Sequence, residues 1–422
     1  MYQRPPAAVL RNRLSEAPRR IQIVAGPRQV GKSTLVKAVL GERDPDSSTY
    51  RSADPGEKAI EVSSRVALNQ RELERAPAVS DARWLEHQWQ IAHERARIWY
   101  SRGGDQAPYV LAIDEIQKIP DWSSTIKGLW DASQNVDPRV HLVLLGSSPL
   151  LMQQGLSESL AGRFELIRMS HWSFEEMNEA FGWTLDQYVY FGGYPESVSL
   201  ISDEARWRDY MQVALIRPNI EKDVFDMARV DQPMLLQQLF EVGCRYSGQI
   251  VALDKVLGTL NSKGNTVTLA RYLELLERAG LLCGLHKYSN QEIRRRRSPP
   301  KFNVLNTSLM SALGTHNFAE AKADRSHWGR LVESAVGAHL CNASDPNLSV
   351  HYWRESPLEV DFVVNKGRRL LALEVKSGKS TNTKPGLDEF CRRHPDCRRL
   401  VVGSEECPLG EFLRQPASHW LD

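Results

Sequence analysis

The sequence predicts an α/β fold that is organised around a phosphate-binding loop. Residues 26–33 read Gly-Pro-Arg-Gln-Val-Gly-Lys-Ser and meet every fixed position of the pattern G-x-x-x-x-G-K-[ST]. The preceding residues 21–25 form an apolar run typical of a short strand, and residues 34–40 have the composition of a helix. Since the pattern requires this order of strand, loop and helix, we expect a nucleotide-binding loop rather than a chance match.

Each part of this loop has an expected role. The glycines let the backbone N–H groups converge on phosphates, and Lys32 adds a cation for the β- and γ-phosphates. The Ser33 hydroxyl is placed to ligate Mg²⁺, a role for which Thr34 is the weaker candidate. ATP and Mg²⁺ are therefore the expected cofactors. The expected nucleotide-binding residues are Gly26, Pro27, Arg28, Gln29, Val30, Gly31, Lys32, Ser33 and Thr34.

A second signal for the same site follows the apolar run at residues 109–113. This run predicts a buried parallel strand, whose carboxyl end delivers two carboxylates to the edge where α/β sheets bind ligands. We expect Asp114 to hold Mg²⁺ through water and Glu115 to orient and deprotonate the attacking water.

Two further polar candidates come later in the chain. A third apolar strand ends in Gly-Ser-Ser, which places Ser147 or Ser148 to hydrogen-bond the γ-phosphate or the attacking water. Arg163 could reach a neighbouring subunit's γ-phosphate as a trans-acting finger. That role requires a homo-oligomer. We expect the protein to form one, and a ring is one possible arrangement. An intramolecular ion pair of Arg163 with Glu158 or Glu165 is an equally good interpretation.

A highly charged helical segment lies between these signals, at residues 54–104. Its apolar residues recur at helical spacing, which favours a packed helix face over a base-stacking platform. We therefore expect a helical insertion in the nucleotide-binding domain, with a face made of Leu85, Trp89, Ala92, Ala96 and Trp99.

The motifs, taken in order, resemble a known family. The loop at residues 26–33, the strand end Ile-Asp-Glu-Ile-Gln-Lys, the segment Leu-Ala-Gly-Arg and the sequence Phe-Gly-Gly-Tyr-Pro at residues 191–195 carry the resemblance. They are similar to those of prokaryotic AAA+-type ATPases with a conserved C-terminal domain of unknown function. The resemblance implies an AAA+-like P-loop ATPase domain, a helical lid, a winged-helix-like segment and a restriction-endonuclease-like terminal fold.

This organisation predicts a chain of four parts. We expect an AAA+-type ATP-binding domain over residues 1–185, a helical lid over 186–228, a winged-helix-like domain over 229–315 and a restriction-endonuclease-like α/β domain over 316–422.

The winged-helix-like part rests on three helical runs followed by a strand-like stretch. The third run, at residues 267–277, carries Arg271 with Arg278 close behind, so contact with DNA and a structural or protein-contacting role both remain open.

A basic cluster lies where the wing of such a domain would be. Four phosphate contacts there would give a log–log slope of binding against salt of roughly −4. A solvated charge run is the alternative, and we favour DNA contact. The predicted nucleic-acid contacts are Arg271, Arg294, Arg295, Arg296, Arg297 and Lys301.

The C-terminal part contains a second constellation of charged residues. Glu374 and Lys376 are two apart on a predicted strand, so both side chains face the same way. Asp361 on an adjacent strand can meet Glu374 around one Mg²⁺, with Lys376 near enough to activate water. This resembles the D…E-x-K signature of restriction-endonuclease-like nucleases, with Glu333 as the helical acid. The alternative is a salt bridge on a solvated face.

Composition constrains the partners less than the motifs do. With 54 Lys+Arg against 52 Asp+Glu, the net charge of +2 makes no global argument for nucleic acid. The six cysteines form no C-x-x-C pair, which predicts reduced thiols and a cytoplasmic protein. No apolar run approaches the roughly 20 residues needed to span a bilayer, so we expect no membrane partner.

These observations predict Mg²⁺-dependent ATP hydrolysis coupled to the binding or remodelling of DNA, and they leave open whether the C-terminal part is a metal-dependent nuclease. The alternative is an ATP-dependent switch that acts on a protein partner and carries an inactive nuclease-like fold.

Overall fold

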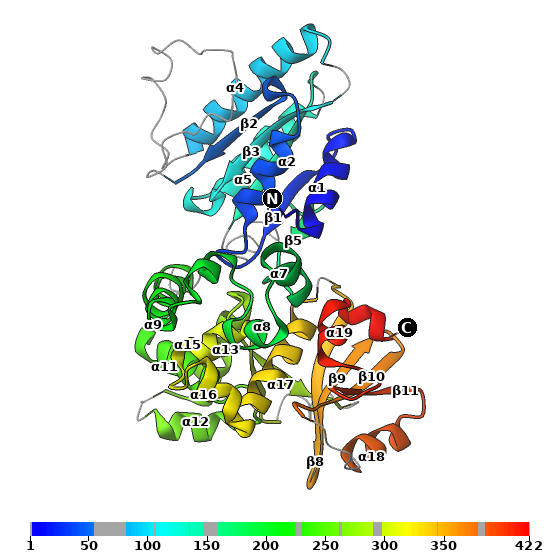
Figure 1. Ribbon diagram of the computed structural model, residues 1–422. Helices are drawn as coiled ribbons and strands as arrows, with labels where there is room; N and C mark the ends of the chain where they lie inside the picture. The colour runs from blue at the N-terminus through cyan, green and yellow to red at the C-terminus, as the bar shows by residue number, and fades with distance from the viewer. Residues whose placement is uncertain are drawn as a thin grey trace. The chain divides into compact units, whose positions relative to one another are not determined.

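The chain folds into two compact units, residues 1–169 and 170–422 (Figure 1). The computed structural model describes residues 2–54, 82–104, 107–134, 136–146, 159–224, 230–260, 264–289, 298–343, 345–378 and 385–421. Within these ranges, no helix combines the length and the hydropathy that a bilayer crossing requires.

The N-terminal unit is built on a parallel sheet. Its described strands are β1 (Ile21–Ala25), β2 (Ser48–Ser52), β3 (Tyr109–Asp114), β4 (Val140–Gly146) and β5 (Phe164–Arg168). They lie in the order β2-β3-β4-β1-β5, and every neighbouring pair is parallel. The carboxyl ends of β1 and β3 therefore meet at one edge of the sheet, with β4 between them.

Helices cover both faces of this sheet. Alternate strand residues point to opposite faces, so Val24 and Val143 pack with α1 (Pro5–Ser15) and α2 (Lys32–Gly41). The opposite face packs against α4 (Ala82–Ser101) and α5 (Trp122–Ser133).

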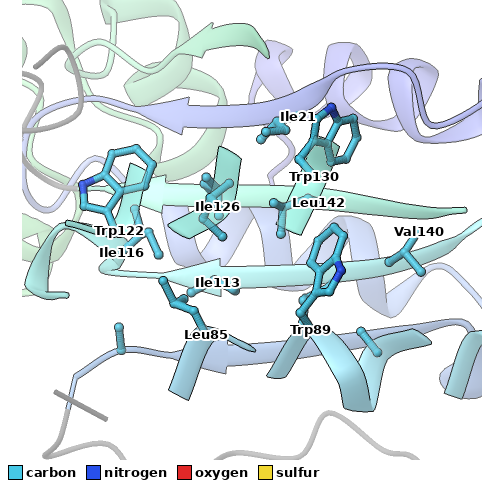
Figure 2. Packing of buried hydrophobic residues seen from close by; sticks show 14 of the residues in the cluster. Ile21, Leu85, Trp89, Ile113, Ile116, Trp122, Ile126, Trp130, Val140 and Leu142 are labelled. Carbon is cyan, nitrogen blue, oxygen red and sulfur yellow. The ribbon is translucent and has the colours of Figure 1, made fainter. Parts of the chain in front are cut away.

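Figure 2 shows the second of these cores, where Trp89 of α4 and Trp130 of α5 lie against the sheet. Their ring centroids are 6.4 Å apart in an edge-on arrangement. Leu85, Trp89, Ala92 and Ala96 are buried on one face of α4, so the packed face predicted from their spacing is confirmed.

The C-terminal unit begins with helices. Ser173 and Thr184 each accept a hydrogen bond from the backbone N–H three residues on. The glutamate or glutamine side chain at that position accepts one from the backbone N–H of Ser173 or Thr184, so the helices that follow both start with a capping box. The described α-helices are α7 (Phe174–Phe181), α8 (Leu185–Phe191), α9 (Glu204–Asp209), α11 (Pro233–Arg245), α12 (Leu253–Thr259), α13 (Thr266–Arg278), α15 (Thr307–Leu313), α16 (Phe318–Ala323), α17 (Arg325–Cys341), α18 (Pro385–Arg393) and α19 (Leu409–Arg414).

A mixed sheet completes this unit. Its described strands are β6 (Leu282–Lys287), β7 (Lys301–Val304), β8 (Leu348–Glu355), β9 (Leu358–Lys366), β10 (Arg369–Val375) and β11 (Cys397–Val402). Their order is β11-β10-β9-β8-β6-β7. The predicted α/β fold class is confirmed, with a parallel sheet in the first unit and this sheet in the second.

The parts predicted to be winged-helix-like and restriction-endonuclease-like share this sheet. Helices α11, α12 and α13 precede the antiparallel pair β6 and β7, which is the order of a winged helix. Strand β6 also pairs in parallel with β8. The boundary predicted between residues 315 and 316 therefore falls inside one compact unit.

Candidate active site

The loop after β1 requires glycine at two positions, Gly26 and Gly31. Gly31 precedes α2 with a φ of 87°, a left-handed conformation that L side chains rarely adopt. A Cβ on Gly26 would lie 1.9 Å from the backbone oxygen of Met169, so the close approach of these two segments excludes a side chain. The loop therefore presents bare backbone at the N-terminus of α2, where N–H groups have no intrahelical acceptor and favour an anion.

Lys32 lies across this loop. Its side chain is only 6% exposed, and its Nζ donates hydrogen bonds to the backbone oxygens of Gly26 at 3.0 Å and Pro27 at 2.7 Å. Because both acceptors are uncharged, a phosphate oxygen would make the stronger, charge-assisted bond with this ammonium.

Ser33 and Asp114 bring the two predicted motifs into contact. Ser33 Oγ donates a hydrogen bond to Asp114 Oδ2 over 2.5 Å, and the Asp114 side chain is nearly buried at the end of β3. Asp114 Oδ1 accepts from the backbone N–H of Glu115 at 2.8 Å. Hydroxyl and carboxylate oxygens are the ligands that Mg²⁺ prefers, so these two side chains fit the ion.

Tyr50 is a member of this group that the sequence analysis missed. Its hydroxyl donates to the same Oδ2 of Asp114 that accepts from Ser33. The contact depends on the pairing of β2 with β3, which places Ser52 beside Asp114. No local pattern around Tyr50 indicates this pairing.

Glu115 has a strained backbone and a perturbed carboxyl group. Its φ is 53°, in the left-handed region that is sparsely populated outside glycine. Burial raises the pKa of the Glu115 carboxyl, and the Asp114 carboxylate raises it further against the opposing Lys32 and Arg28. Gln117 Nε2 donates to Glu115 Oε2 at 2.6 Å. A raised pKa suits a carboxylate that accepts a proton.

Thr34 and Val30 are two further residues of the loop. Thr34 is exposed, whereas Ser33 makes the contact with Asp114. The backbone oxygen of Val30 accepts a hydrogen bond from Arg4 Nη1 at 3.0 Å. Arg4 is buried and was missed as well, because its distance of 26 positions from Val30 gives no local signal.

Ser147 and Arg163 are the two candidates from later in the chain. Ser147 lies outside the described residues, and β4 ends at the preceding Gly146. Arg163 forms a two-pronged ion pair with Asp131 of α5, with N–O distances of 2.7 and 2.9 Å. An intramolecular ion pair thus exists, with a partner other than the two glutamates considered from the sequence.

The predicted nucleic-acid contacts separate into three groups. Arg271 lies on the exposed face of α13. Arg294, Arg295, Arg296 and Arg297 lie outside the described residues. The prediction for Lys301 is corrected, because Lys301 is the first residue of the buried strand β7 and is 0% exposed.

Lys301 instead joins the acidic residues of the C-terminal unit. Its Nζ lies 2.5 Å from Glu333 Oε1 of α17 and donates to the backbone oxygen of Asp361 of β9 at 3.0 Å. Burial raises the pKa of Glu333 to about 7, while Lys301 acts in the opposite direction.

The other two residues of the D…E-x-K constellation lie on or beside β10. Glu374 is nearly buried on β10, the strand that neighbours β9, and Lys376 follows the end of β10. Asp361 Oδ2 accepts a hydrogen bond from the backbone N–H of Val375 at 2.8 Å. In the part of the chain that the structure describes, no three His, Cys, Asp or Glu side chains are grouped to hold a metal ion.

Family models match most of the chain in three consecutive segments. Residues 18–178 match a model described as an AAA domain. Residues 182–321 and 328–414 match two models described as domains of unknown function, DUF8612 and DUF4143. No curated protein was found to match the sequence.

Solved structures with a similar arrangement were also found. The Walker-type ATPase of Pyrococcus abyssi is 15% identical over 74% of this chain and 96% of its own, with a TM-score of 0.45. The Aeropyrum pernix ORC1 protein in complex with DNA is 11% identical over 73% and 91%, with a TM-score of 0.30. A Thermotoga maritima RuvB variant is 16% identical over 66% and 86%, with a TM-score of 0.29.

The phosphate-binding loop, the parallel sheet and the family-model match together identify residues 18–178 as an AAA domain with a P-loop fold. Two domains of unknown function follow this AAA domain along the chain. The resemblance to the AAA+-type ATPases with a conserved C-terminal domain of unknown function is therefore confirmed.

Proposed function

We propose that the N-terminal unit hydrolyses ATP with Mg²⁺. The observation that carries this proposal is the 2.5 Å hydrogen bond between Ser33 and Asp114, which joins the helix after the loop to the end of β3. It gathers a phosphate cradle, two metal-ligand side chains and the neighbouring carboxylate of Glu115 at one edge of the sheet.

In this mechanism the chain positions the reacting groups. The backbone N–H groups at the start of α2 and the Lys32 ammonium bind the phosphates, and Ser33 and Asp114 hold Mg²⁺. When bound, Mg²⁺ neutralises charge on the phosphates. Glu115 accepts a proton from water as the water oxygen bonds to the γ-phosphorus and the bond to the ADP oxygen breaks.

The first test is the steady-state ATPase rate of Lys32→Ala. Loss of the ammonium should abolish nucleotide binding or turnover, while Lys127→Ala on the exposed side of α5 is the matched control. Hydrolysis by Lys32→Ala at the rate of the control would contradict the proposed site.

We further propose that hydrolysis is coupled to DNA, as binding or remodelling. Support comes from the exposed position of Arg271 on α13, the third helix before the β6 and β7 pair, and from the run of Arg294, Arg295, Arg296 and Arg297 in the sequence. Neutralising phosphates with these side chains would release counterions and make binding salt-dependent.

DNA coupling is tested by the ATPase rate with single-stranded, duplex and branched DNA at increasing salt. We expect stimulation that fades with salt and that is lost when the four arginines of residues 294–297 are replaced by alanine. Replacement of Arg368 in the turn before β10 and of Arg369 at the start of β10 is the control in the same unit. A rate indifferent to every DNA would contradict the coupling.

The second candidate function is an ATP-dependent switch that acts on a protein partner while the nuclease-like fold cuts nothing. The position of Lys301 among the acidic residues favours an inert fold. Slow turnover without any response to DNA, together with the absence of metal-dependent cleavage, is the result expected for the switch. The proposal also includes a homo-oligomer, a cytoplasmic location without a membrane partner, and the four-part division of the chain.

A further inference from the structure

Lys301 is a buried cation that lies beside the carboxylates of Glu333 and Asp361 in the C-terminal unit. Its side chain is 0% exposed. Its Nζ lies 2.5 Å from Glu333 Oε1, 3.0 Å from the backbone oxygen of Asp361 and 4.0 Å from Asp361 Oδ1. The same ammonium lies 4.6 Å from the centroid of the Phe362 ring.

A buried ammonium is costly unless its donors and its charge are both satisfied. An ammonium has three donors and no acceptor, and here it meets oxygens from two elements, helix α17 and strand β9. Burial lowers the pKa of Lys301, but Glu333 and Asp361 together outweigh burial and leave it above its ordinary value. The oxygens of Glu333 and Asp361 therefore supply the partners that a buried ammonium needs.

The same carboxylates are the ones that the D…E-x-K resemblance assigns to a metal ion. A divalent ion there would face a fixed positive charge at close range. Asp361 Oδ2 already accepts a hydrogen bond from the backbone of Val375, and Mg²⁺ demands several oxygens at about 2.0–2.1 Å in octahedral geometry. The described residues group no three metal-ligand side chains at this place. Lys301 and the backbone N–H of Val375 thus occupy oxygens of Glu333 and Asp361 that a metal ion would need.

We propose that Lys301 is a built-in counter-cation that takes the place of a metal ion, so that the nuclease-like domain of this protein works without metal and does not cut DNA. Glu333 and Asp361 then have a structural task, in which they fasten β7 to α17 and β9 through one ammonium. Because β7 belongs to the β6 and β7 pair of the winged-helix-like part, this contact joins that part to the nuclease-like part.

The first experiment measures Mn²⁺ binding by electron paramagnetic resonance. The full chain carries Asp114→Asn and is free of nucleotide, so that the ATP site contributes no ion. We expect no stoichiometric Mn²⁺ site at pH 8. One bound Mn²⁺ per chain that disappears with Asp361→Asn would overturn the proposal, as would metal-dependent DNA cleavage that Asp361→Ala abolishes.

The second experiment compares melting temperatures at pH 8. Lys301→Met leaves two partly buried carboxylates without their cation and should lower the melting temperature by roughly 5–10 °C. The matched control is Lys366→Met, which removes a partly exposed ion pair with Asp345 at 2.7 Å on β9 and should have little effect.

A double variant keeps this experiment decisive if Lys301→Met fails to fold. Lys301→Met with Glu333→Gln removes the carboxylate closest to the ammonium together with the cation and leaves only Asp361, so it should recover part of the lost stability. A Lys301→Met protein that melts with the wild type, or a double variant less stable than Lys301→Met, would contradict the counter-cation role.

Discussion

Ser33 Oγ donates a hydrogen bond to Asp114 Oδ2 over 2.5 Å, although 81 positions separate the two residues in the chain. The contact is possible because β1, which precedes the loop of Ser33, and β3, which ends at Asp114, run in the same direction with only β4 between them. The sheet order thus brings together the residues of the proposed ATP site.

Tyr50 should position Asp114 for the metal ion. Tyr50→Phe removes the hydroxyl that donates to Asp114 Oδ2, so the carboxylate loses one of its orienting partners. We expect the Mg²⁺ concentration for half-maximal ATPase activity to rise about tenfold, as for partners that orient metal ligands elsewhere. Tyr109→Phe is the control, since the Tyr109 hydroxyl bonds Thr49 on the other face of the sheet. Equal Mg²⁺ dependence of both variants would exclude a positioning role for Tyr50.

Gly26→Ala should disrupt the phosphate-binding loop. Its Cβ would lie 1.9 Å from the backbone oxygen of Met169, so the loop or the segment after β5 must shift. We expect a loss of stability of about 1–3 kcal/mol and a loss of ATP binding, measured by denaturation and by titration of a fluorescent nucleotide. Gly41→Ala at the end of α2 meets no atom within 4 Å and should behave as the wild type. Retained ATP affinity in Gly26→Ala would show that the close approach is unimportant.

Arg163 should act in an oligomer if it leaves Asp131 for a neighbouring subunit's γ-phosphate. In that case Arg163→Ala and Lys32→Ala, each inactive alone, should regain part of the ATPase activity when mixed. The mixed assembly places an intact Arg163 beside an intact phosphate-binding loop. Mixing of Asp131→Asn with Lys32→Ala is the control, because Asp131→Asn keeps the arginine. Mixtures that stay inactive while the variants co-assemble would assign Arg163 to its intramolecular ion pair with Asp131 alone.

His141 should make the N-terminal unit less stable in acid. Burial lowers the pKa of His141 to about 4, and its Nε2 bonds the backbone oxygen of Glu16 at 3.0 Å. Between pH 6.5 and 4 the unfolded chain binds a proton at this residue that the native state does not. The free energy of unfolding therefore falls as the pH falls, by roughly 2 kcal/mol at pH 5.

His141→Gln keeps a donor for Glu16 and removes the titration. Urea denaturation at pH 7 and pH 5 should show a smaller acid loss for this variant than for the wild type. The same acid loss in both proteins would assign the pH dependence to other groups.

The parts that depend on local patterns were predictable from the sequence. The phosphate-binding loop, the carboxylates at the end of β3 and the packed face of α4 each follow from spacing within one element. Tyr50 and Arg4 were not predictable, because each contact depends on which elements become neighbours. Lys301 was misplaced because it follows two prolines and an arginine run, which together have the composition of a loop. Only the sheet shows that Lys301 begins a buried strand.

The most direct test of the central claim compares ATP binding and single-turnover hydrolysis in Glu115→Gln. We predict unchanged ATP affinity and a rate lower by a factor of about 10²–10⁴, because the variant keeps the phosphate contacts and loses the proton acceptor. Glu86→Gln, on the exposed face of α4, is the control. Hydrolysis by Glu115→Gln at the wild-type rate would contradict the account, since the carboxylate beside Asp114 would then have no part in the reaction.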